Sequence, residues 1–566
     1  MGLILGMDTG GTFTDAVLLD KDSKTIIKKA KAPTTKEDLC IGIRESIEAL
    51  DYENMSDIGL VCLSTTLATN SIVEGKGCRV GLVITGKRPY EKLPEAEIVQ
   101  VGGALDIRGR LQHDLDENYA RKVIRSLAGK VDAVAVSGYA CVRNPEHEII
   151  VRRLVREELD VPVVCAHELT CELGYYERTV TVILNARLIP LIKRLIDDTR
   201  ICLEEMDVHV PIMVVRGDGS YMDSEYAVER PVETILSGPA ASIKGAMFLS
   251  GLDEGTIIDM GGTTSDIAML KGGKVGVSME GAKVGGWRTR VKAIDVYTCG
   301  IGGDSRISFD NSGNITIGPD KIIPVSYASS KGLAAKIEEA WMSVQEHEYR
   351  SIFGMSESRN DIGLTPTDIA HAAGLYDAWD KGAVEACLKE LCEKMNIGRE
   401  ALLAKLINAF GGAVTYALEK SGKTSENVPV VALGAPSESW MPVVLKDSRY
   451  ELVVPELSEV ANAVGAAIGE IEEVVKILVR QDELTGRFIG YSRWFRREYD
   501  TLEEAKVSCV KEAERYAAEE SIKCGCVAPN IFSDVHDEYC ESYDGKRKDW
   551  IETVITAVAT GEPRFI

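Results

Sequence analysis

The sequence has no excess of basic residues and no long run of uncharged apolar residues. Lysine and arginine number 65 against 88 aspartates and glutamates, so the net charge is −23. Because nucleic-acid backbones are held by clustered Lys and Arg, a nucleic-acid-binding role is not expected. The longest apolar runs have the length of a strand, well short of the ~18 residues of a membrane span, and no basic segment precedes the first apolar stretch. We therefore expect a cytoplasmic protein that does not span a membrane.

Several well-known catalytic motifs are incomplete or absent. "GLVITGKR" approaches a P-loop, but Arg88 stands where Ser or Thr would bind Mg²⁺. In "GIGGDS", Ser305 takes the place of the last glycine of a dinucleotide-binding fingerprint. His147 and Glu148 are not followed by the second His of a zinc-protease motif, and no nucleophile elbow of the form G-x-S-x-G occurs. If the protein is an enzyme, the remaining signals indicate nucleotide phosphate chemistry.

The fourteen cysteines are spread along the chain and do not frame a small disulfide scaffold, so reduced thiols are expected. The exception is a C-terminal group of metal-ligand residue types, namely Cys524, Cys526, Asp534, His536 and Cys540. Their spacing matches no zinc signature, and a structural or incidental role is the favoured interpretation.

What the chain does contain is one unusual phrase, present twice. "GMDTGGTFTD" begins at Gly6 and "IIDMGGTTSD" begins at Ile257, and each lies between two short apolar runs. This pattern predicts a strand, a tight glycine turn and a second strand, that is, a β-hairpin in each place. The candidate site residues are Asp8, Gly10, Gly11, Thr12 and Asp15 in the first copy and Asp259, Gly261, Gly262, Thr263 and Asp266 in the second.

The residue types in this phrase suit phosphate chemistry. Adjacent glycines leave backbone N–H groups uncovered by any Cβ, as a phosphate-binding loop requires. The carboxylates of Asp8, Asp259 and Asp266 could hold a hydrated Mg²⁺, which takes one or two carboxylates beside phosphate oxygens. For either copy alone, an ordinary glycine turn with a capping Asp is the simpler interpretation. The repetition favours a site.

At 566 residues the chain should contain two to four domains. Strand and helix patterns alternate, and their order begins again at the second hairpin, which predicts two similar α/β lobes from a duplication with a nucleotide cleft between them. We predict domains at residues 1–176, 177–480 and 481–566, the last a C-terminal α+β extension. A long helix is expected from Glu177, with Pro190 inside it, and another over Ser458–Val475.

Further candidates lie outside the repeated phrase. Gly302 and Gly303 form a third glycine-rich turn, and Gly434 ends a buried strand; both places could face a nucleotide. The remaining candidates are three cations and two histidines that are either structural or catalytic, namely Lys76, Arg178, Lys244, His147 and His167.

The chain resembles the hydantoinase A/5-oxoprolinase family, which includes ATP-using subunits of acetone and acetophenone carboxylases. The family's phrases occur in order over roughly the first 320 residues. They are "DTGGTFTDAVLLD", "STTLATNSIVEGKG", "NPEHE", "AHEL", "YYERTVTVILNARLIP", "SGPAAS" and "DMGGTTSDIA". The chain departs from the family where Leu63-Ser64-Thr65-Thr66 replaces the usual H-G-T-T.

The resemblance implies an actin-like (ribonuclease-H-like) ATPase fold that binds ATP and Mg²⁺. It also implies that Asp8 and Asp259 position Mg²⁺ or the attacking oxygen. The activity implied is phosphorylation of a lactam, cyclic imide, hydantoin or carbonyl compound, which a hydantoinase B-like partner subunit then hydrolyses or carboxylates in a hetero-oligomer. Two alternatives stay open: a self-sufficient small-molecule kinase, and an ATP-driven conformational switch acting on a partner protein.

Overall fold

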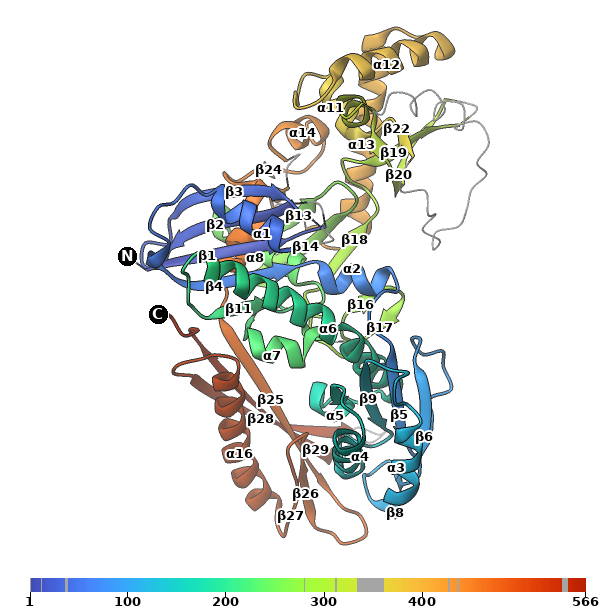
Figure 1. The fold of residues 1–566 in the computed structure, drawn as a ribbon, viewed down its shortest axis with the longest axis vertical. Helices are drawn as coiled ribbons and strands as arrows, with labels where there is room; N and C mark the ends of the chain where they lie inside the picture. The colour runs from blue at the N-terminus through green and yellow to red at the C-terminus, as the bar shows by residue number, and fades with distance from the viewer. Residues whose placement is uncertain are drawn as a thin grey trace. The chain divides into compact units, whose positions relative to one another are not determined.

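The computed structural model describes residues 2–11, 13–35, 39–278, 280–310, 313–332, 361–425, 428–434, 437–541 and 548–566. The chain divides into two compact units (Figure 1). Unit 1 contains Met1–Ala241, Val277–Ile294 and Ala466–Ile566, and unit 2 contains Ser242–Gly276 and Asp295–Gly465. The predicted domain boundaries after residues 176 and 480 divide the chain into consecutive segments of the sequence, and they stay a prediction.

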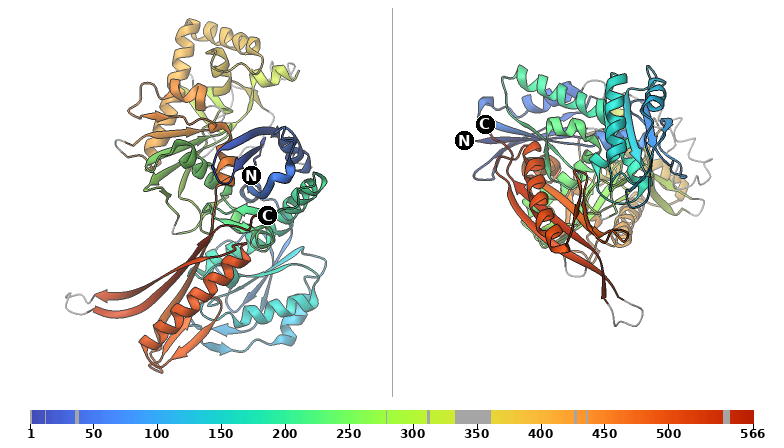
Figure 2. Two further views of the ribbon diagram at one scale, coloured as in Figure 1. Left: turned by 90° about the vertical axis from the view of Figure 1, so that its left-hand side faces the viewer. Right: turned by 90° about the horizontal axis from the view of Figure 1, so that it is seen from below.

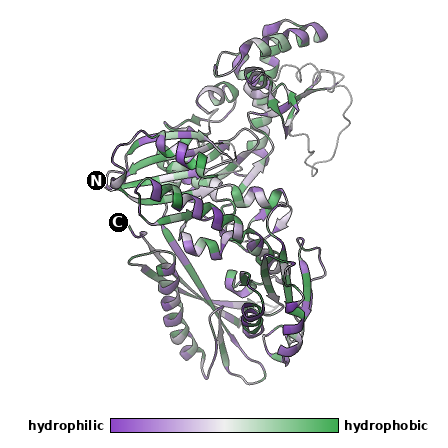
Figure 3. Ribbon diagram, in the orientation of Figure 1, coloured by the Kyte–Doolittle hydropathy of each residue, from purple (hydrophilic) through white to green (hydrophobic). Residues whose placement is uncertain are grey.

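The first sheet of unit 1 has the strand order β12-β11-β4-β1-β2-β3. Strands β1, β2 and β3 form an antiparallel meander, whereas β4 and β11 run parallel to β1. Every residue of β1 and β4 is buried, and hydrophobic residues line these strands (Figure 3). The strands are β1 (Leu3–Thr9), β2 (Phe13–Asp20), β3 (Ile26–Pro33), β4 (Ile58–Thr65), β11 (Ile212–Val215) and β12 (Tyr221–Asp223).

A second sheet of unit 1 is inserted between β4 and β11 and is fully parallel, with the order β10-β9-β5-β6. Its central strands β5 and β9 are buried along their whole length, as expected for a parallel sheet covered on both faces. The strands are β5 (Val80–Thr85), β6 (Glu97–Val101), β9 (Ala133–Gly138) and β10 (Val163–Cys165), with a small hairpin of β7 (Ala104–Leu105) and β8 (Leu111–His113).

Helices surround the two sheets of unit 1, and α6 (Tyr175–Glu205) is the long helix predicted from Glu177, with Pro190 inside it. Its first half is almost entirely buried and packs against β9. The other helices are α1 (Leu39–Glu48), α2 (Leu67–Val73), α3 (Glu117–Arg125), α4 (Glu146–Glu158), α5 (Ala166–Leu169) and α7 (Ser224–Glu229), with 3-10 turns η1 (Met55–Asp57) and η2 (Pro231–Thr234). The helix α8 (Ser237–Ser250) begins in unit 1 and continues into unit 2.

The C-terminal sheet of unit 1 is antiparallel, with the order β27-β26-β25-β29-β28, and α16 covers one face. Strands β28 and β29 run together as a long hairpin (Figure 2). The chain end returns to the first sheet, where Ile566 N–H donates to Gly59 O. The elements are β25 (Ile471–Gln481), β26 (Phe488–Tyr491), β27 (Arg496–Tyr499), α16 (Leu502–Lys523), β28 (Asn530–Glu541) and β29 (Lys548–Gly561).

The helix predicted over Ser458–Val475 is wrong in its second half. A 3-10 turn, η3 (Ser458–Val460), leads into α15 (Ala461–Ala467), which ends before β25 begins at Ile471. Residues alternate between buried and exposed along β25, the period of a strand with one face on a core. Of the acidic residues in "GEIEEVV", Glu472 lies at an exposed position of β25, whereas Glu473 is buried, where it pairs with Arg216.

Unit 2 contains a sheet with the same plan as the first sheet of unit 1. Strand β13 pairs antiparallel with β14 and parallel with β23, and β24 is parallel to β23. Both β15 and β18 pair with β14. The sheet of unit 2 therefore repeats the arrangement of unit 1, in which an antiparallel meander (β3-β2-β1) is followed by the parallel strands β4 and β11. This confirms the α/β class and shows the predicted restart of the element order. The strands are β13 (Gly255–Met260), β14 (Ser265–Lys271), β15 (Lys274–Val275), β18 (Val296–Cys299), β23 (Val430–Leu433) and β24 (Leu452–Val453).

The rest of unit 2 is largely helical, and small strand pairs occur in both units. The helices are α9 (Val325–Ser330), α11 (Pro366–Ala372), α12 (Lys381–Met395), α13 (Arg399–Lys420) and α14 (Ser437–Val444). The short strands are β16 (Lys283–Val284) and β17 (Trp287–Arg288) in unit 1, and β19 (Ser305–Phe309), β20 (Ile315–Lys321), β21 (Ile323–Pro324) and β22 (Ile362–Gly363) in unit 2.

One helix of the described residues, α13, is long and apolar enough to cross a membrane by length and composition. The sequence analysis predicted apolar runs no longer than a strand and did not identify this helix. Its residues Leu402, Leu406 and Phe410 are buried in the core of unit 2, and Phe410 stacks on Trp440. Packing in a protein core accounts for the composition of α13.

Buried ion pairs join the C-terminal sheet to the first part of unit 1. Arg216, directly after β11, pairs with Glu233 at 3.0 Å and with Glu473 of β25. The Cys524 thiol at the end of α16 donates to the same Glu473 carboxylate at 3.0 Å. Arg216 is 7% exposed, so removing one partner would leave buried charges uncompensated.

We expect Arg216→Ala to destabilise unit 1 by about 3–5 kcal/mol, because the buried carboxylate of Glu473 would lose the arginine that it pairs with, whereas Glu233 keeps Arg230. Thermal unfolding followed by circular dichroism, with limited trypsin digestion of the C-terminal sheet, measures the effect. Lys193→Ala is the matched control, since Lys193 pairs with Asp197 at an exposed position and such pairs contribute less than about 1 kcal/mol. Equal melting temperatures for both variants would contradict a stabilising role for this network.

Candidate functional site

Both copies of the repeated phrase form hairpins with the same turn. In unit 1, Gly10 N–H donates to Phe13 O at 3.0 Å, and in unit 2 Gly261 N–H donates to Thr264 O at 2.9 Å. Each turn therefore has two residues between the closing pair, the length of the tightest β-hairpin loops. The first strand of each hairpin brings its aspartate to the turn, one or two residues before the first glycine.

Close approach by neighbouring atoms, and not a left-handed backbone, explains Gly10 and Gly262 in these turns. Gly10, Gly11, Gly261 and Gly262 all have φ outside the positive region. A Cβ on Gly10 would lie 2.9 Å from Phe13 O, and one on Gly262 would lie 2.5 Å from Asp304 Oδ2. Any side chain at these places would push the turn away from its neighbours.

Each hairpin places two aspartates directly opposite each other. Asp8 pairs in register with Asp15, and Asp259 pairs with Asp266. Like charges at facing positions destabilise a sheet unless a positive charge offsets them. In unit 1 Lys31 supplies that charge, with its Nζ 3.1 Å from Asp15 Oδ1.

In unit 1 the carboxylate of Asp8 is buried at the end of β1, where the Ser64 hydroxyl donates to it at 2.5 Å. The first turn of α8 lies beside it, since a Cβ on Gly238 would be 4.0 Å from Asp8 Oδ1. Ser237 attaches this helix end to β4 by donating to Thr65 O at 2.8 Å. Hairpin amides and a helix N-terminus at one place form an environment that favours an anion such as phosphate.

In unit 2 the pKa of Asp266 is raised to about 6 by burial and by the nearby charge of Asp259. The Thr298 hydroxyl on β18 donates to Asp266 Oδ1 and opposes the rise. A divalent cation beside these two acids would relieve their repulsion.

The third glycine-rich turn lies against the second hairpin, so residues of both turns can belong to one site. Gly303 N–H donates to Gly261 O at 3.0 Å, and Asp304 N–H donates to Gly262 O at 2.7 Å. A Cβ on Gly302 would lie 2.7 Å from Gly261 O. The contact between these two turns therefore depends on glycine at Gly302.

Gly434 also belongs to this group. It follows β23, the parallel neighbour of β13, and its φ is +97°. A Cβ there would lie 2.2 Å from Met260 O and 3.3 Å from Asp259 Oδ1. Within unit 2 the structure thus brings together all the site residues predicted there, namely Asp259, Gly261, Gly262, Thr263, Asp266, Gly302, Gly303 and Gly434.

In unit 1 the structure brings together Asp8, Gly10 and Gly11, whereas Thr12 lies outside the described residues. The sequence interpretation missed several polar partners that hold the sites. Ser64 and Ser237 serve the first hairpin, and Thr298 serves the second. Ser64 and Ser237 both lie in the quoted family phrases, so those phrases could have identified them as candidate site residues. Thr298 directly precedes "CGIGG" and had no distinctive pattern of its own.

The other sequence candidates have separate surroundings. Lys76 is exposed and pairs with Glu74, Lys244 lies on α8, and Arg178 is buried on α6. His147 is buried, which lowers its pKa, and packs beside Gly103. Structural roles account for Lys76 and His147.

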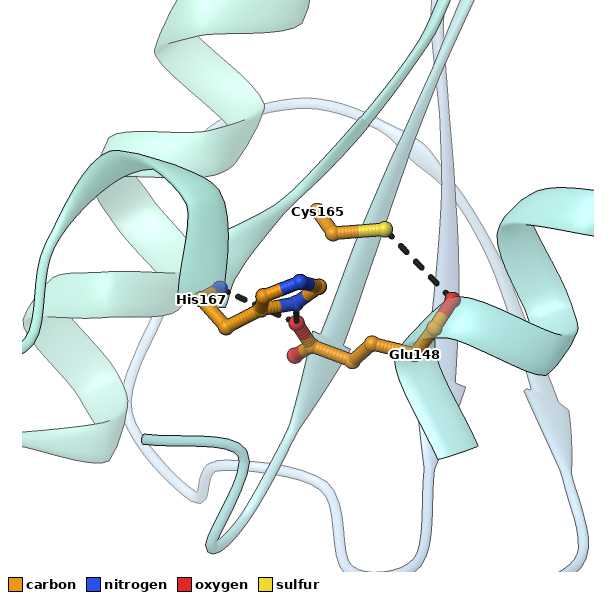
Figure 4. Close-up of side chains that lie close together, drawn as sticks. All are labelled: Glu148, Cys165 and His167. Atoms are coloured by element: carbon orange, nitrogen blue, oxygen red, sulfur yellow. Dashed lines mark hydrogen bonds and ion pairs between the residues drawn. The ribbon is translucent and has the colours of Figure 1, made fainter. Parts of the chain in front are cut away.

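His167 forms a buried cluster with Glu148 and Cys165 (Figure 4). Candidate ligand atoms of the three lie within 4.8 Å of one another. However, Glu148 already accepts hydrogen bonds from Gly138 N–H at 2.6 Å, His167 N–H at 3.0 Å and the His167 ring at 2.6 Å. Burial raises the pKa of the Cys165 thiol well above its usual value, which disfavours the thiolate that a metal needs. We interpret the cluster as a hydrogen-bonded clamp.

The C-terminal cysteines form no metal cluster among the residues the structure describes. Cys524 bonds to Glu473 and Arg216, and Cys540 is exposed on β28. These positions agree with a structural or incidental role.

Comparison with known proteins adds relatives to this geometry. The caprolactamase subunit alpha of Pseudomonas jessenii is 31% identical over 350 residues, which are 56% of this chain and 50% of the relative. The acetophenone carboxylase gamma subunit of Aromatoleum aromaticum is 30% identical over 363 residues, 56% of this chain and 49% of the relative. This chain therefore spans about half the length of these curated relatives.

The fold also matches a solved structure and two family models. The crystal structure of an ATP-dependent caprolactamase from Pseudomonas jessenii aligns with a TM-score of 0.71 at 21% identity, covering 98% of this chain and 87% of that one. Residues 4–159 match the hydantoinase/oxoprolinase N-terminal region, and residues 178–335 match the hydantoinase/oxoprolinase model. Both models describe one family and adjoin along the chain, in the order of the quoted phrases. The chain belongs to the hydantoinase/oxoprolinase family.

Proposed function

We propose that this chain is an ATP-using activating subunit of the cytoplasm, which phosphorylates a lactam, cyclic imide, hydantoin or carbonyl compound. A partner subunit of the hydantoinase B kind then hydrolyses or carboxylates the activated product. The observation that carries the proposal is the recurrence of the Asp-x-Gly-Gly-Thr hairpin at the same place in two sheets of the same plan. The names of relatives, an ATP-dependent caprolactamase and a carboxylase subunit, support the substrate class.

In this proposal the hairpin turns bind ATP phosphates. The N–H groups of Gly10 and Gly261 close the two turns, so the donors to phosphate would be the backbone N–H groups of Gly11 and Thr12 in the first turn and of Gly262 and Thr263 in the second. The first turn of α8 adds its N–H groups near Asp8. Gly302, Gly303 and Gly434 keep backbone close to the second hairpin and leave room for the nucleotide.

The acidic residues present fit Mg²⁺. Asp259 and Asp266 face each other, and the raised pKa of Asp266 reflects charge that a cation would offset. Asp8 in unit 1, and Asp259 and Asp266 in unit 2, are each proposed as Mg²⁺ ligands, and a bound ion would neutralise charge on the phosphates. Asp8 and Asp259 would also orient the attacking oxygen.

The chemistry is a phosphoryl transfer. The acceptor loses the proton next to its carbonyl group to a carboxylate base, and the carbonyl oxygen forms a bond to the γ-phosphorus of ATP. The bond between that phosphorus and the bridging oxygen breaks, and ADP leaves. The product is an imidate or enol phosphate, whose phosphate is a good leaving group for the partner's reaction. Positioning and charge neutralisation provide most of the rate enhancement in such transfers.

Replacing Asp8 or Asp259 by Ala should reduce substrate-stimulated ATP turnover at least about 100-fold, because each variant loses a carboxylate that positions the reacting groups. The measurement is ATP hydrolysis with Mg²⁺ in the presence of hydantoin, 5-oxoproline, caprolactam, acetone or acetophenone, with and without the copurifying partner subunit. Asp20→Ala is the matched control, since Asp20 lies at the far end of β2, where it bonds to Ser23.

A stable phosphorylated product formed without a partner would favour the self-sufficient kinase instead. Turnover stimulated only by a protein, with no small molecule phosphorylated, would favour the conformational switch. Full activity in both Asp variants would overturn the proposal.

Asp266→Asn should raise the melting temperature of the metal-free protein at about pH 8 and reduce Mg²⁺-dependent turnover by about tenfold or more. The folded-state pKa of about 6 lies above the usual aspartate value of 3.8, so ionising Asp266 destabilises the folded protein as pH rises from about 4 to about 6. The gain in melting temperature should therefore be smaller at about pH 5 than at about pH 8.

Thermal scans at both pH values and Mg²⁺ titrations of turnover test this expectation. Asp253→Asn serves as a control, because Asp253 is an exposed aspartate of the same unit. An Asp266→Asn variant with wild-type Mg²⁺ dependence would remove Asp266 from the metal site.

A further inference from the structure

A pocket of about 200 Å³ lies within unit 1, away from the residues of the first hairpin. Three segments form it: Ile107 between β7 and β8, the loop after β9, and the start of α6. Loops after the carboxyl ends of parallel strands are common places for ligands in α/β proteins. The main lining residues are Tyr139, Arg143, Leu173, Gly174, Tyr175 and Arg178.

Two buried arginines line this pocket, with exposed fractions of 9% for Arg143 and 2% for Arg178. Arg178 donates to Glu172 O at 3.3 Å and to Tyr139 O at 2.8 Å, and Arg143 donates to Ile107 O. Among the described residues neither arginine forms an ion pair, and the Nε atom of each has no hydrogen-bond partner. Each guanidinium also lies 5.9 Å from the centroid of a tyrosine ring, Arg143 at Tyr491 and Arg178 at Tyr175. A buried cation held by carbonyl groups and an aromatic ring favours an additional anion.

The start of α6 adds to this positive environment. This helix has 31 residues and begins at the pocket, directly after Gly174, which has φ +103° and no side chain to cap the first N–H groups. Uncapped N–H groups and the helix dipole attract negative charge, and Glu177 of the first turn, whose Oε2 lies 2.5 Å from the place of a Cβ on Gly174, offsets part of this positive potential. None of the described residues that line the pocket is acidic, although the chain carries a net charge of −23.

The walls are aromatic and aliphatic. The rings of Tyr139 and Tyr175 meet edge to face with centroids 5.5 Å apart, and Leu173 and Ile107 are largely exposed beside them. Such walls favour a ligand with an apolar body over a small inorganic ion. We propose that this pocket binds a small organic carboxylate, with the carboxylate at Arg143 and Arg178 and the apolar part against the tyrosines.

The clamp of Glu148 and His167 positions one wall of the pocket. Glu148 accepts the Gly138 N–H at the end of β9, immediately before the loop that carries Tyr139 and Arg143. The same carboxylate holds His167 on α5. The loop is therefore attached at its first residue to a buried hydrogen-bonded group, which gives the pocket a fixed shape.

The test uses isothermal titration calorimetry of the full chain without nucleotide, so its outcome does not depend on ATP chemistry. Three probes separate the contributions: benzoate, its neutral analogue benzamide, and acetate, which lacks the ring. We expect benzoate to bind at least about tenfold more tightly than benzamide, because only benzoate offers a charge to the arginines. Benzoate should also bind more tightly than acetate, because the ring contacts the tyrosines.

Arg143→Gln and Arg178→Gln should each weaken benzoate binding at least about tenfold and leave benzamide binding unchanged. Arg187→Gln is the matched control: Arg187 is another buried arginine of α6 with an unpartnered Nε, but it does not line the pocket. Equal affinity for benzoate and benzamide in the wild type would overturn the proposal even if a variant fails to fold. An equal loss of benzoate affinity in the Arg187→Gln control would also overturn the proposal. Acetate binding as tightly as benzoate would overturn the claim that the ligand has an apolar organic part.

Discussion

The candidate site of unit 2 depends on contact between backbones that carry no side chains. Gly302 lies against Gly261, and Gly434 lies against Met260 at the end of β13. A single Cβ at Gly302 or Gly434 would come within 2.7 or 2.2 Å of a backbone oxygen. The turn, the third glycine loop and the strand β23 can therefore meet only as they do here. The sheet would still hold Asp259 and Asp266 without this contact, but the glycine loops predicted to face a nucleotide would lie farther from them.

The two hairpins share a backbone plan but differ in how their paired acids are compensated. In unit 1, Lys31 pairs with Asp15, and Ser64 donates to Asp8. In unit 2, the influences on Asp266 are burial, a hydroxyl and a second carboxylate, and its pKa rises to about 6. The second aspartate of each pair therefore has different electrostatic surroundings in the two hairpins, although the repeated phrase is nearly the same.

Local features of the chain could be predicted from sequence, and long-range partners could not. The hairpins follow from glycines between short apolar runs, and α6 follows from its helical spacing from Glu177 onward. The contacts of Ser64 with Asp8 and of Thr298 with Asp266 join residues more than thirty positions apart, which local patterns do not encode. Arg178 was recognisable as a cation of interest, but its burial beside Arg143 depends on how β9 and α6 pack. The strand β25 was mistaken for helix because a small-residue helix runs into it after a short gap.

Within unit 1, a chain of contacts connects the pocket lined by Arg143 and Arg178 to the first hairpin. The helix α6 starts at the pocket, and its buried Asn185 donates to Glu229 O at 3.0 Å and accepts Val232 N–H at 3.1 Å, which holds η2. The segment after η2 leads directly into α8, whose Ser237 bonds to the end of β4 beside Asp8. The bonds made by Val232, Ser237 and Ser64 are buried and the one to Glu229 O is partly buried, so packed structure connects the pocket to the hairpin. A ligand in the pocket would therefore be held at one position relative to Asp8, and the carboxylate proposed there would act as an anchor whose distance from the phosphate-binding turn is set by α6.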